Sequence, residues 1–405
     1  MNAAGAPGQV LLGLGNSVDC EVVWSEPILN ALIASHHIGS DDLDAAAAIT
    51  TERDLVRVLA AHLRVGAGGE RNVASATALT AFVGRHEHRF SLGGSNVRAS
   101  LVLDLFGIRS TLHLVNASAT VRELLPATAT WAASGSFAED FPHLIVQFPA
   151  GAHLRLADGT EVVSPRANRV ILVHDPPNEA MELAPDLGAY VARADLVLVS
   201  GLNAMKDADL LGQRLTDLRE LLSGARPGAV VMYEDAGYHV PGFGALVADA
   251  LVEVIDIHSL NEDELQAWLG RAVDLTDGAA VARAVTELRR RVPARNTVLH
   301  THAWSLVRGP DAHDLRAALS GGVAAASARF LAGDAATRAT LASVARTPLH
   351  PVGAAMASTL AAMAPDEVAA VPARLLRVSD PTTIGLGDAF VGGFIADLAG
   401  NQRVP

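Results

Sequence analysis

Cysteine, lysine and aromatic residues are scarce in this chain of 405 residues, and each shortage excludes something. The single cysteine, Cys20, excludes an intrachain disulfide and any zinc site built from several cysteines. We expect its thiol to be a small buried apolar group rather than a nucleophile. Only 4% of the residues are aromatic although 50% are hydrophobic, so the apolar mass is alanine, valine and leucine, which favours helices packed on buried strands.

The only lysine is Lys206, and the residue before it is Met205 rather than a glycine. A phosphate-binding loop of the form Gly-x-x-x-x-Gly-Lys is therefore excluded. Any phosphate chemistry in this protein must use arginine side chains, backbone amides, helix N-termini and metal ions instead.

Acidic residues outnumber basic ones, and the formal net charge is -13. This balance argues against a nucleic acid or an anionic membrane as a partner, because either would select a basic surface. No run approaches about 18 uninterrupted apolar residues, so we expect no transmembrane helix. The first residues lack the basic start and the long apolar run of a signal peptide, and we therefore expect a cytoplasmic protein.

The chain is long enough for one large α/β domain and a smaller one. Its start predicts a buried parallel strand at 10–14. The residues that follow include the polar side chains of Asn16 and Asp19. Ligands bind at the carboxyl ends of strands in open α/β sheets, so these side chains are candidates for a binding site.

The remaining patterns predict two kinds of region. A helical spacing of apolar residues extends from 41 to about 65. Between 107 and 200, short β-like runs and a hairpin-turn signal at 157–160 predict a small β-rich subdomain. After about residue 182, strands and helices alternate regularly, which predicts a parallel sheet with helices on its faces.

The strongest local signal lies at 380–390, which reads Asp-Pro-Thr-Thr-Ile-Gly-Leu-Gly-Asp-Ala-Phe. Its two glycines, Gly385 and Gly387, allow a tight turn that points backbone amides at an anion. Asp388 would then begin a helix, where a carboxylate is stabilised and can accept the proton of a hydroxyl that attacks a phosphate. The alternative is that Asp388 only caps a helix after a glycine turn.

A second signal, Ser-Leu-Asn-Glu-Asp-Glu-Leu at 259–265, follows a strand-like run at 251–255. Asn261 and Glu264 are three residues apart and share one face of a helical first turn. Together they are suited to hold the waters of a magnesium ion, which prefers oxygen ligands. The alternative is a capped helix start, with Ser259 or Asn261 as the N-cap.

The two signals together resemble the ribokinase-like sugar kinases, in which Asn-x-x-Glu is followed much later by Gly-x-Gly-Asp. Further short stretches resemble one branch of that superfamily, the ADP-dependent glucokinases and phosphofructokinases. These stretches are Gly66–Glu70, Arg89–Gly94, Pro165–Arg169, Val199–Leu202, His258–Leu265 and Thr383–Asp388. Each is short, and what is specific is that they occur in the family's order over about residues 13 to 395.

The resemblance implies an α/β protein with a ribokinase-like three-layer α/β/α core, a mostly parallel sheet and a smaller β-rich lid domain. The core segments it implies are 1–20, 92–143 and 182–405, and the approximate lid segments are 21–40, 85–91 and 144–181. The implied activity is that of an ADP-dependent sugar kinase. Such an enzyme transfers a phosphoryl group from Mg-ADP to a hydroxyl of a hexose or hexose phosphate, of the glucose or fructose 6-phosphate type, and releases AMP.

The same resemblance assigns roles in phosphoryl transfer. Asp388 matches the catalytic base, and the amides of Gly385, Leu386 and Gly387 match the anion hole. Arg169 is expected to pair with the nucleotide phosphates, a useful role in a chain almost without lysine.

On the nucleotide side, Asn261 and Glu264 match the pair that organises magnesium, and Glu234 is expected to join Glu264 around the metal. Thr383 flanks the glycine turn and is expected to contact the nucleotide. His302 lies near the expected position of the adenine, where a nucleotide-lining or structural histidine is favoured over a metal ligand.

On the sugar side, the residues that match or extend the family's contacts are Asn16, Asp19, Glu87, Gly93, Gly94 and Asn96. Asn16 and Asp19 match side chains that hold sugar hydroxyls, and the two glycines match a close backbone approach to the sugar. A glutamate before the double glycine tends to accompany glucokinase activity in this family, and Glu87 is the candidate here.

The chain departs from the family at two places. The usual His-x-Glu reads Met232-Tyr233-Glu234, and the usual Gly-Gly-Gln or Gly-Gly-Asn reads Gly93-Gly94-Ser95-Asn96, which moves the amide by one residue. Two alternatives therefore stay open: an ATP-dependent ribokinase-like sugar or nucleoside kinase, and a non-catalytic sugar-binding relative. No long apolar seam requires a dimer, so we expect a monomer or a small homo-oligomer.

Overall fold

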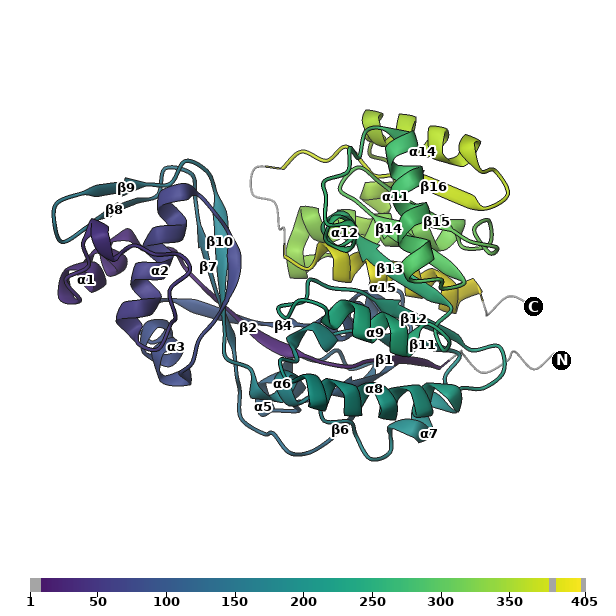
Figure 1. Cartoon of the computed structure of the whole chain (residues 1–405), viewed down its shortest axis with the longest axis horizontal. Helices are drawn as coiled ribbons and strands as arrows, with labels where there is room; N and C mark the ends of the chain where they lie inside the picture. Colours follow the sequence, from purple (N-terminus) through teal and green to yellow (C-terminus); the bar gives the residue numbers. More distant parts are fainter. Residues whose placement is uncertain (1–8, 379–383, 402–405) are drawn as a thin grey trace.

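The computed structural model describes residues 9–378 and 384–401 and divides them between two lobes (Figure 1). The larger lobe, at the right of Figure 1, contains a nine-stranded sheet and most of the helices. The smaller lobe, at the left, contains a five-stranded sheet with the helices α1 (Glu26–Ser35), α2 (Glu52–Val65) and α3 (Ala76–Val83).

The large sheet has the strand order β16-β15-β14-β13-β12-β11-β1-β5-β6. All neighbouring strands from β14 to β6 in this order are parallel. At the other end of the sheet, β15 runs antiparallel to β14, and β16 runs antiparallel to β15. The strands are β1 (Val10–Leu12), β5 (Ser110–Leu114), β6 (Ala129–Ala133), β11 (Leu196–Val199), β12 (Val230–Glu234), β13 (Ile257–Asn261), β14 (Asn296–His300), β15 (Trp304–Arg308) and β16 (Val368–Pro372).

Helices cover both faces of this sheet, because its central strands are apolar on both sides. Leu198 packs against α4, α12 and α15 on one face, while its neighbours Val197 and Val199 pack against α8 and α9 on the other. Farther along the second face, Leu299 packs with α10, α11 and α14. The helices concerned are α4 (Ser95–Leu105), α8 (Ala208–Ser223), α9 (Phe243–Leu251), α10 (Glu262–Leu269), α11 (Gly278–Arg291), α12 (Arg316–Ala332), α14 (Pro351–Met363) and α15 (Leu386–Asn401). The predicted three-layer α/β/α core with a mostly parallel sheet is confirmed.

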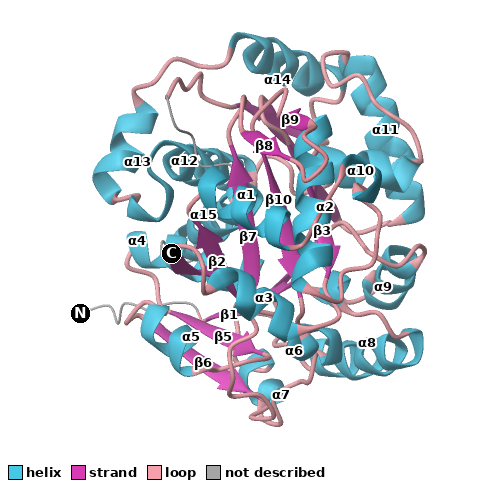
Figure 2. Cartoon of the chain, turned by 90° about the vertical axis from the view of Figure 1, so that its left-hand side faces the viewer, coloured by secondary structure: helices cyan, strands magenta, loops and turns pink. Residues whose placement is uncertain are grey.

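The smaller sheet has the order β3-β10-β7-β2-β4, with mixed strand directions. Its strands are β2 (Ser17–Val22), β3 (Gly69–Asn72), β4 (His88–Gly93), β7 (His143–Phe148) and β10 (Asn168–Val173). One face of the sheet is covered by the helices of the lobe, which lie in front of it in Figure 2. The turn predicted at 157–160 joins β8 (His153–Arg155) to β9 (Glu161–Val163) in an antiparallel hairpin beside those helices, so a β-rich second lobe is confirmed.

Two local predictions differ from the structure. The run at 251–255 is not a strand: Leu251 ends α9, and the strand begins at Ile257. A short apolar run has no periodicity that separates a strand from the end of a buried helix, which explains the error. The helix predicted from 41 begins only at Glu52, where Thr51 caps it by accepting a hydrogen bond from the amide of Asp54.

Residues 43–83, which the motifs assign to neither domain, pack in the smaller lobe through side chains such as Leu55, Leu59 and Phe82. The boundaries proposed for the core and lid segments stay a prediction. Within the described ranges, no helix combines the length and apolar character needed to span a bilayer.

The crossing of α15 over α12 leaves no room for a side chain at Gly393. A Cβ atom there would lie 2.3 Å from the carbonyl oxygen of Gly321 and 2.6 Å from Cβ of Ala325. We expect Gly393→Ala to lower the free energy of unfolding by about 1–3 kcal/mol, because the two helices must move apart. Urea unfolding measures this change.

Gly400→Ala is the matched control, since it lies in the same helix and its Cβ would have no neighbour within 4 Å. It should be neutral or slightly stabilising, because alanine favours the helix. Equal stability of the two variants would contradict the packing argument.

Candidate active site

The smaller sheet turns a polar face toward the larger lobe because side chains alternate along its strands. On β2, Ser17, Asp19 and Glu21 point to one side, whereas Cys20 and Val22 are buried on the other. Burial, together with the charges of Glu21 and Asp19, raises the pKa of the Cys20 thiol to about 11. The expectation that Cys20 is buried is confirmed, and the raised pKa keeps its thiol protonated near neutral pH.

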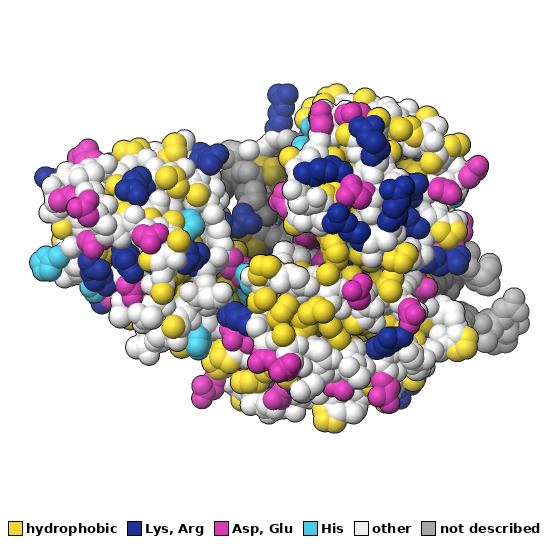
Figure 3. Space-filling model, in the orientation of Figure 1, with side chains coloured by type: hydrophobic (Ala, Val, Ile, Leu, Met, Phe, Trp, Pro, Cys, Tyr) yellow, Lys and Arg dark blue, Asp and Glu magenta, His cyan; other side chains and the backbone are white. Residues whose placement is uncertain are grey.

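A cavity of about 320 Å³ lies between this polar face and the larger lobe, where the molecule is hollowed in Figure 3. The larger lobe contributes the segments that follow β1, β11 and β12, and the N-termini of α4 and α15. These segments converge because the carboxyl ends of parallel strands meet at one edge of a sheet. Polar lining residues include Asn16, Asp19, Glu70, Ser95, Arg98, His143, Asp175, Asn178, Lys206, Glu234, His239 and Asp388.

Asp388 is the third residue of α15. Its carboxylate accepts a hydrogen bond from Oγ of Ser95 at 2.6 Å, and Nε of Arg98 lies 3.6 Å away. Gly385 turns the chain into the helix with a φ of +66°, and a Cβ there would lie 2.7 Å from Cδ of Arg98. Because the first amides of a helix have no intrahelical acceptor, Leu386 and Gly387 keep N–H groups suited to an anion.

Arg98 joins the predicted sugar-binding carboxylate to the predicted base. Its side chain is 3% exposed; Nη2 donates to Asp19 at 2.7 Å, and Nη1 lies 3.8 Å from Asp334. Burial disfavours the charge, but the charges of Asp19 and Asp388 outweigh it and raise the pKa of Arg98. Sequence reasoning missed this residue, although an arginine one turn after the double glycine stands out in a chain with a single lysine.

Among the other predicted sugar contacts, Asn16 lines the cavity, but its side chain is engaged with backbone. Its amide donates to the carbonyl of Asn116 and accepts from the amide of Val115. Gly94 lines the cavity too, and a Cβ there would lie 2.9 Å from the carbonyl oxygen of Gly15. Asn96 does not reach the cavity: it is fully buried and donates to the carbonyl of His113.

Neighbouring side chains of the protein leave no room for a Cβ atom at Gly93. A Cβ at this position would lie 2.4 Å from Oδ1 of Asp19 and 2.3 Å from Oγ of Ser17. The glycine therefore lets β4 pack closely against the polar side chains of β2, which it pairs with in antiparallel register.

Asn261 and Glu264 form a capping box at the start of α10, as the alternative to a metal role predicts. Asn261 accepts from the amide of Glu264 at 3.0 Å, and its own amides donate to the Glu264 carboxylate at 2.8 and 2.9 Å. Burial and the charge of Glu234 raise the pKa of Glu264 well above its usual value.

The neighbouring carboxylates of Glu234 and Glu264 also fit a hydrated cation. Oε2 of Glu234 is buried and has no hydrogen-bond partner among the described residues. Over the same residues, no three His, Cys, Asp or Glu side chains are placed to ligate a metal directly. A magnesium ion would therefore be held through waters and substrate phosphates, which suits its reluctance to lose water.

Glu234 contacts a histidine that does not come from its own strand. Met232 is fully buried in the apolar core, whereas Nε2 of His300, at the end of β14, lies 3.1 Å from Oε1 of Glu234. The ring of His300 also stacks on Phe390 of α15, with 4.6 Å between centroids. This histidine thus connects the expected metal carboxylate to the helix that carries Asp388.

The cavity lining does not include Arg169, Glu87 or His302. Arg169 shares the face of β10 with Ile171, which lines the cavity, but lies farther along the strand; burial lowers its pKa. Glu87 is exposed just before β4, and His302 is 73% exposed beside Glu262. Thr383 lies outside the described residues.

Sequence reasoning also missed the ion pairs that line the cavity. His143 of β7 contacts Asp175 at 2.6 Å, and His239 contacts Glu70 of β3 at 3.0 Å. Lys206 pairs with Glu179. Asp175 lines the cavity and also caps α6 (Pro176–Ala180), where its side chain accepts from the amide of Asn178.

Comparison with known proteins gives one family and a consistent fold. A model of the conserved region of ADP-specific phosphofructokinases and glucokinases matches residues 8–328. No curated protein matched. Among solved structures, a hypothetical ADP-dependent phosphofructokinase from Pyrococcus horikoshii is 15% identical, with a TM-score of 0.80 and 99% of both chains covered. An ADP-dependent kinase complex with fructose-6-phosphate and ADPbetaS is 14% identical, with a TM-score of 0.71, covering 98% of this chain and 95% of that one.

The His143–Asp175 pair generates a prediction about protonation. Burial would lower the pKa of His143, but the hydrogen bond and charge of Asp175 raise it to about 9. We expect Asp175→Asn to return this pKa to the ordinary value of about 6.5 or below. A ¹⁵N NMR titration of the imidazole measures it, with Asp249→Asn on the exposed face of α9 as control.

Because the folded pKa is raised, the pair's contribution to stability is complete below about pH 6.5 and is lost as the pH rises through about 9. The stability difference between the parent and Asp175→Asn should shrink over that interval. An unchanged His143 pKa in Asp175→Asn would show that the pair is not the cause.

Proposed function

Because this chain belongs to the ADP-specific phosphofructokinase and glucokinase family, and is therefore a phosphotransferase with an alcohol group as acceptor, we propose that it transfers the β-phosphoryl group of Mg-ADP to a hydroxyl of a hexose and releases AMP. The observation that carries this proposal is that Asp19 and Asp388, the latter in the first turn of α15, line one cavity. A base, a carboxylate for sugar hydroxyls and an anion-binding helix terminus are the groups that such a transfer needs.

In the proposed reaction, the sugar lies against the polar face of the smaller sheet, with Asp19 accepting from its hydroxyls. The acceptor hydroxyl points at Asp388, and its proton passes to the Asp388 carboxylate as the oxygen attacks the terminal phosphorus of the nucleotide. Ser95 and Arg98 hold that carboxylate in place. The amides of Leu386 and Gly387, with Gly385 before them, face the charge that develops on the transferred group.

A magnesium ion bound near Glu234 and Glu264 would neutralise phosphate charge. Glu264 would accept from metal-bound water. Burial, and then the charge of Glu234, raise the pKa of Glu264, and a cation beside the two carboxylates would favour its charged form. Asn261 fixes the orientation of Glu264 through the capping box.

The charges of the cavity favour a neutral hexose over a hexose phosphate as the acceptor. Each cationic side chain in the described lining already has a carboxylate partner: Arg98 with Asp19, His143 with Asp175, His239 with Glu70, and Lys206 with Glu179. The Arg98 nitrogen without a hydrogen bond, Nη1, lies beside Asp334, which is not part of this lining. Carboxylates are good acceptors for sugar hydroxyls but repel a phosphate. Glu70 lines the cavity and Glu87 does not, so Glu70 takes the proposed contact with the sugar.

The two alternatives differ in what supports them. The non-catalytic relative is motivated by the missing histidine and the altered double-glycine motif, and the hydrogen bond between His300 and Glu234 answers the first of these. The ATP-dependent kinase shares the same base and anion site, so only the choice of donor separates it from the proposal.

A phosphoryl-transfer assay on a panel of sugars and sugar phosphates tests the reaction, with ADP and ATP in parallel and AMP followed directly. We expect AMP from ADP with a neutral hexose such as glucose, little turnover with fructose 6-phosphate, and loss of turnover when magnesium is chelated. Turnover with ATP alone would favour the wider ribokinase group. Sugar binding without turnover on either donor would favour the non-catalytic relative.

Asp388→Asn tests the base. The amide keeps the shape and the contact with Ser95 but cannot accept the proton, so we expect kcat to fall about a thousandfold while sugar affinity and the melting temperature stay close to those of the parent. Asp249→Asn, which removes one exposed charge, should leave kcat unchanged. Near-normal turnover of Asp388→Asn would refute the assignment.

A further inference from the structure

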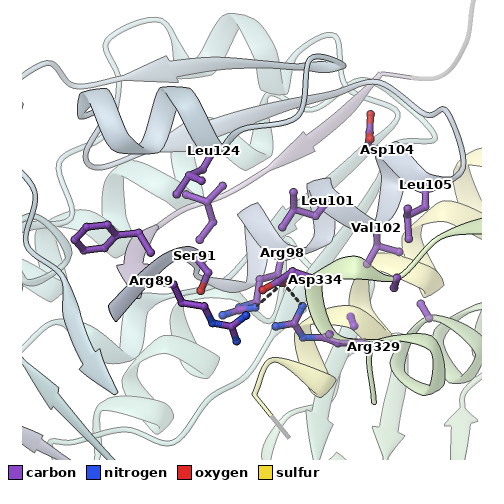
Figure 4. Close-up of a pocket in the computed structure, with 16 residues that line it drawn as sticks. Arg89, Ser91, Arg98, Leu101, Val102, Asp104, Leu105, Leu124, Arg329 and Asp334 are labelled. Atoms are coloured by element: carbon purple, nitrogen blue, oxygen red, sulfur yellow. Dashed lines mark hydrogen bonds and ion pairs between the residues drawn. The ribbon is translucent and has the colours of Figure 1, made fainter. Parts of the chain in front are cut away.

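A second cavity of about 370 Å³ lies on the other side of Arg98, between β4, α4 and the end of α12 (Figure 4). We call it the arginine cavity, after Arg89, Arg98 and Arg329. Among the described residues that line the two cavities, Arg98 is the one they share. The volume is in the range of small-molecule sites, which are about 300–1,000 Å³.

One wall of the arginine cavity is apolar. Leu101, Val102 and Leu105 project from α4, and Leu124, the last residue of α5 (Ala119–Leu124), faces them across the space in Figure 4. Hydrocarbon groups bind such a surface because contact removes apolar area from water.

The opposite wall holds three guanidinium groups around one carboxylate. Nη1 of Arg329 donates to Asp334 at 2.7 Å, and Nη1 of Arg98 lies 3.8 Å from the same oxygen; dashed lines mark both pairs in Figure 4. Arg89 points toward this group from β4 and pairs with Glu21 at 2.8 Å. Burial would raise the pKa of Asp334, but the hydrogen bond from Arg329 and the charges of Arg329, Arg98 and Arg89 hold it below its usual value.

The guanidinium groups have donors to spare. Nη1 of Arg98 is buried and makes no hydrogen bond to any described residue. A guanidinium carries five N–H donors. The side chains of Arg98 and Arg329 are 3% and 11% exposed, so these two groups are held by the surrounding protein rather than moving in solvent. A tetrahedral dianion offers terminal oxygens to several such donors at once, often bidentately.

From these observations we propose that the arginine cavity binds a small phosphate monoester with an apolar ester group. The phosphate contacts Arg89, Arg98 and Arg329 in place of Asp334, and the ester group lies against Leu101, Val102 and Leu105. This site is distinct from the cavity that contains Asp388, because Arg98 is the one described residue that lines both.

Arg98 also couples the two cavities, a consequence that rests on the proposed function. A phosphate that attracts Arg98 into the arginine cavity weakens its 2.7 Å contact with Asp19, the carboxylate that holds the sugar. Sugar affinity therefore falls when the arginine cavity is occupied, and linkage requires that the sugar weaken phosphate binding by the same factor.

Isothermal titration of the whole protein with phenyl phosphate tests the site. Inorganic phosphate probes the three arginines alone, and benzyl alcohol probes the apolar wall alone. We expect phenyl phosphate to bind more tightly than inorganic phosphate and benzyl alcohol not to bind measurably. Absence of phenyl phosphate binding, or equal binding of all three, would overturn the proposal.

Three variants locate the binding. Arg89→Gln, at a side chain 68% exposed and safe for folding, should weaken phenyl phosphate roughly fivefold, the effect of one charge-assisted contact. Asp334→Asn should strengthen it, because the carboxylate that competes with the phosphate is gone. Lys206→Gln removes one charge from the other cavity and should change nothing. If Lys206→Gln weakens binding and Arg89→Gln does not, the ligand occupies the other cavity and the proposal is wrong.

The coupling is tested by titrating glucose with and without saturating phenyl phosphate. We expect its affinity to fall at least twofold, and by the same factor in the reverse experiment. An unchanged affinity would refute the coupling. If glucose does not bind at all, the proposed acceptor is wrong, yet the contrast between Arg89→Gln and Lys206→Gln still decides whether the arginine cavity is a site.

Discussion

A buried guanidinium between two carboxylates is the interaction on which the rest of this site depends. Arg98 comes from α4 of the larger lobe, Asp19 from β2 of the smaller sheet, and Asp388 from α15. Removing Asp19, the buried partner in the 2.7 Å contact, would leave an uncompensated charge and cost about 3–5 kcal/mol, whereas Asp388 is 25% exposed and lies 3.6 Å away. Apolar packing alone would tolerate small displacements of these elements, whereas the charges hold the three in one arrangement.

Where we propose that the metal binds, contacts link the carboxylate of Glu234 to the same helix, α15. Glu264 is oriented by Asn261, Glu234 is hydrogen-bonded by His300, and His300 stacks on Phe390, two residues after Asp388. The family pattern has a histidine two positions before Glu234, and here that position is a buried methionine. The position of a side chain in space, rather than its place in a motif, therefore carries the contact.

Much of the fold was predictable because it follows from local chemistry. Apolar strands alternating with helices predicted the layered core, and the Asp-Gly turn predicted the hairpin between β8 and β9. The Gly-x-Gly-Asp motif located Asp388, since a glycine turn before a helix is a local feature. Patterns without periodicity failed: the run at 251–255 was taken for a strand although it ends a helix.

By itself, then, the sequence determined the elements, the family resemblance and the residues at helix and strand ends, because those depend on neighbours within a few positions. Only the tertiary structure decided which polar groups meet. Glu70 rather than Glu87 reaches the cavity. The side chain of Asn96 is hydrogen-bonded inside the core, and Arg98 joins Asp19 to Asp388. These outcomes depend on how two sheets, distant in sequence, are packed, and the energy of a buried charge exists only once its partners and its exclusion from water are in place.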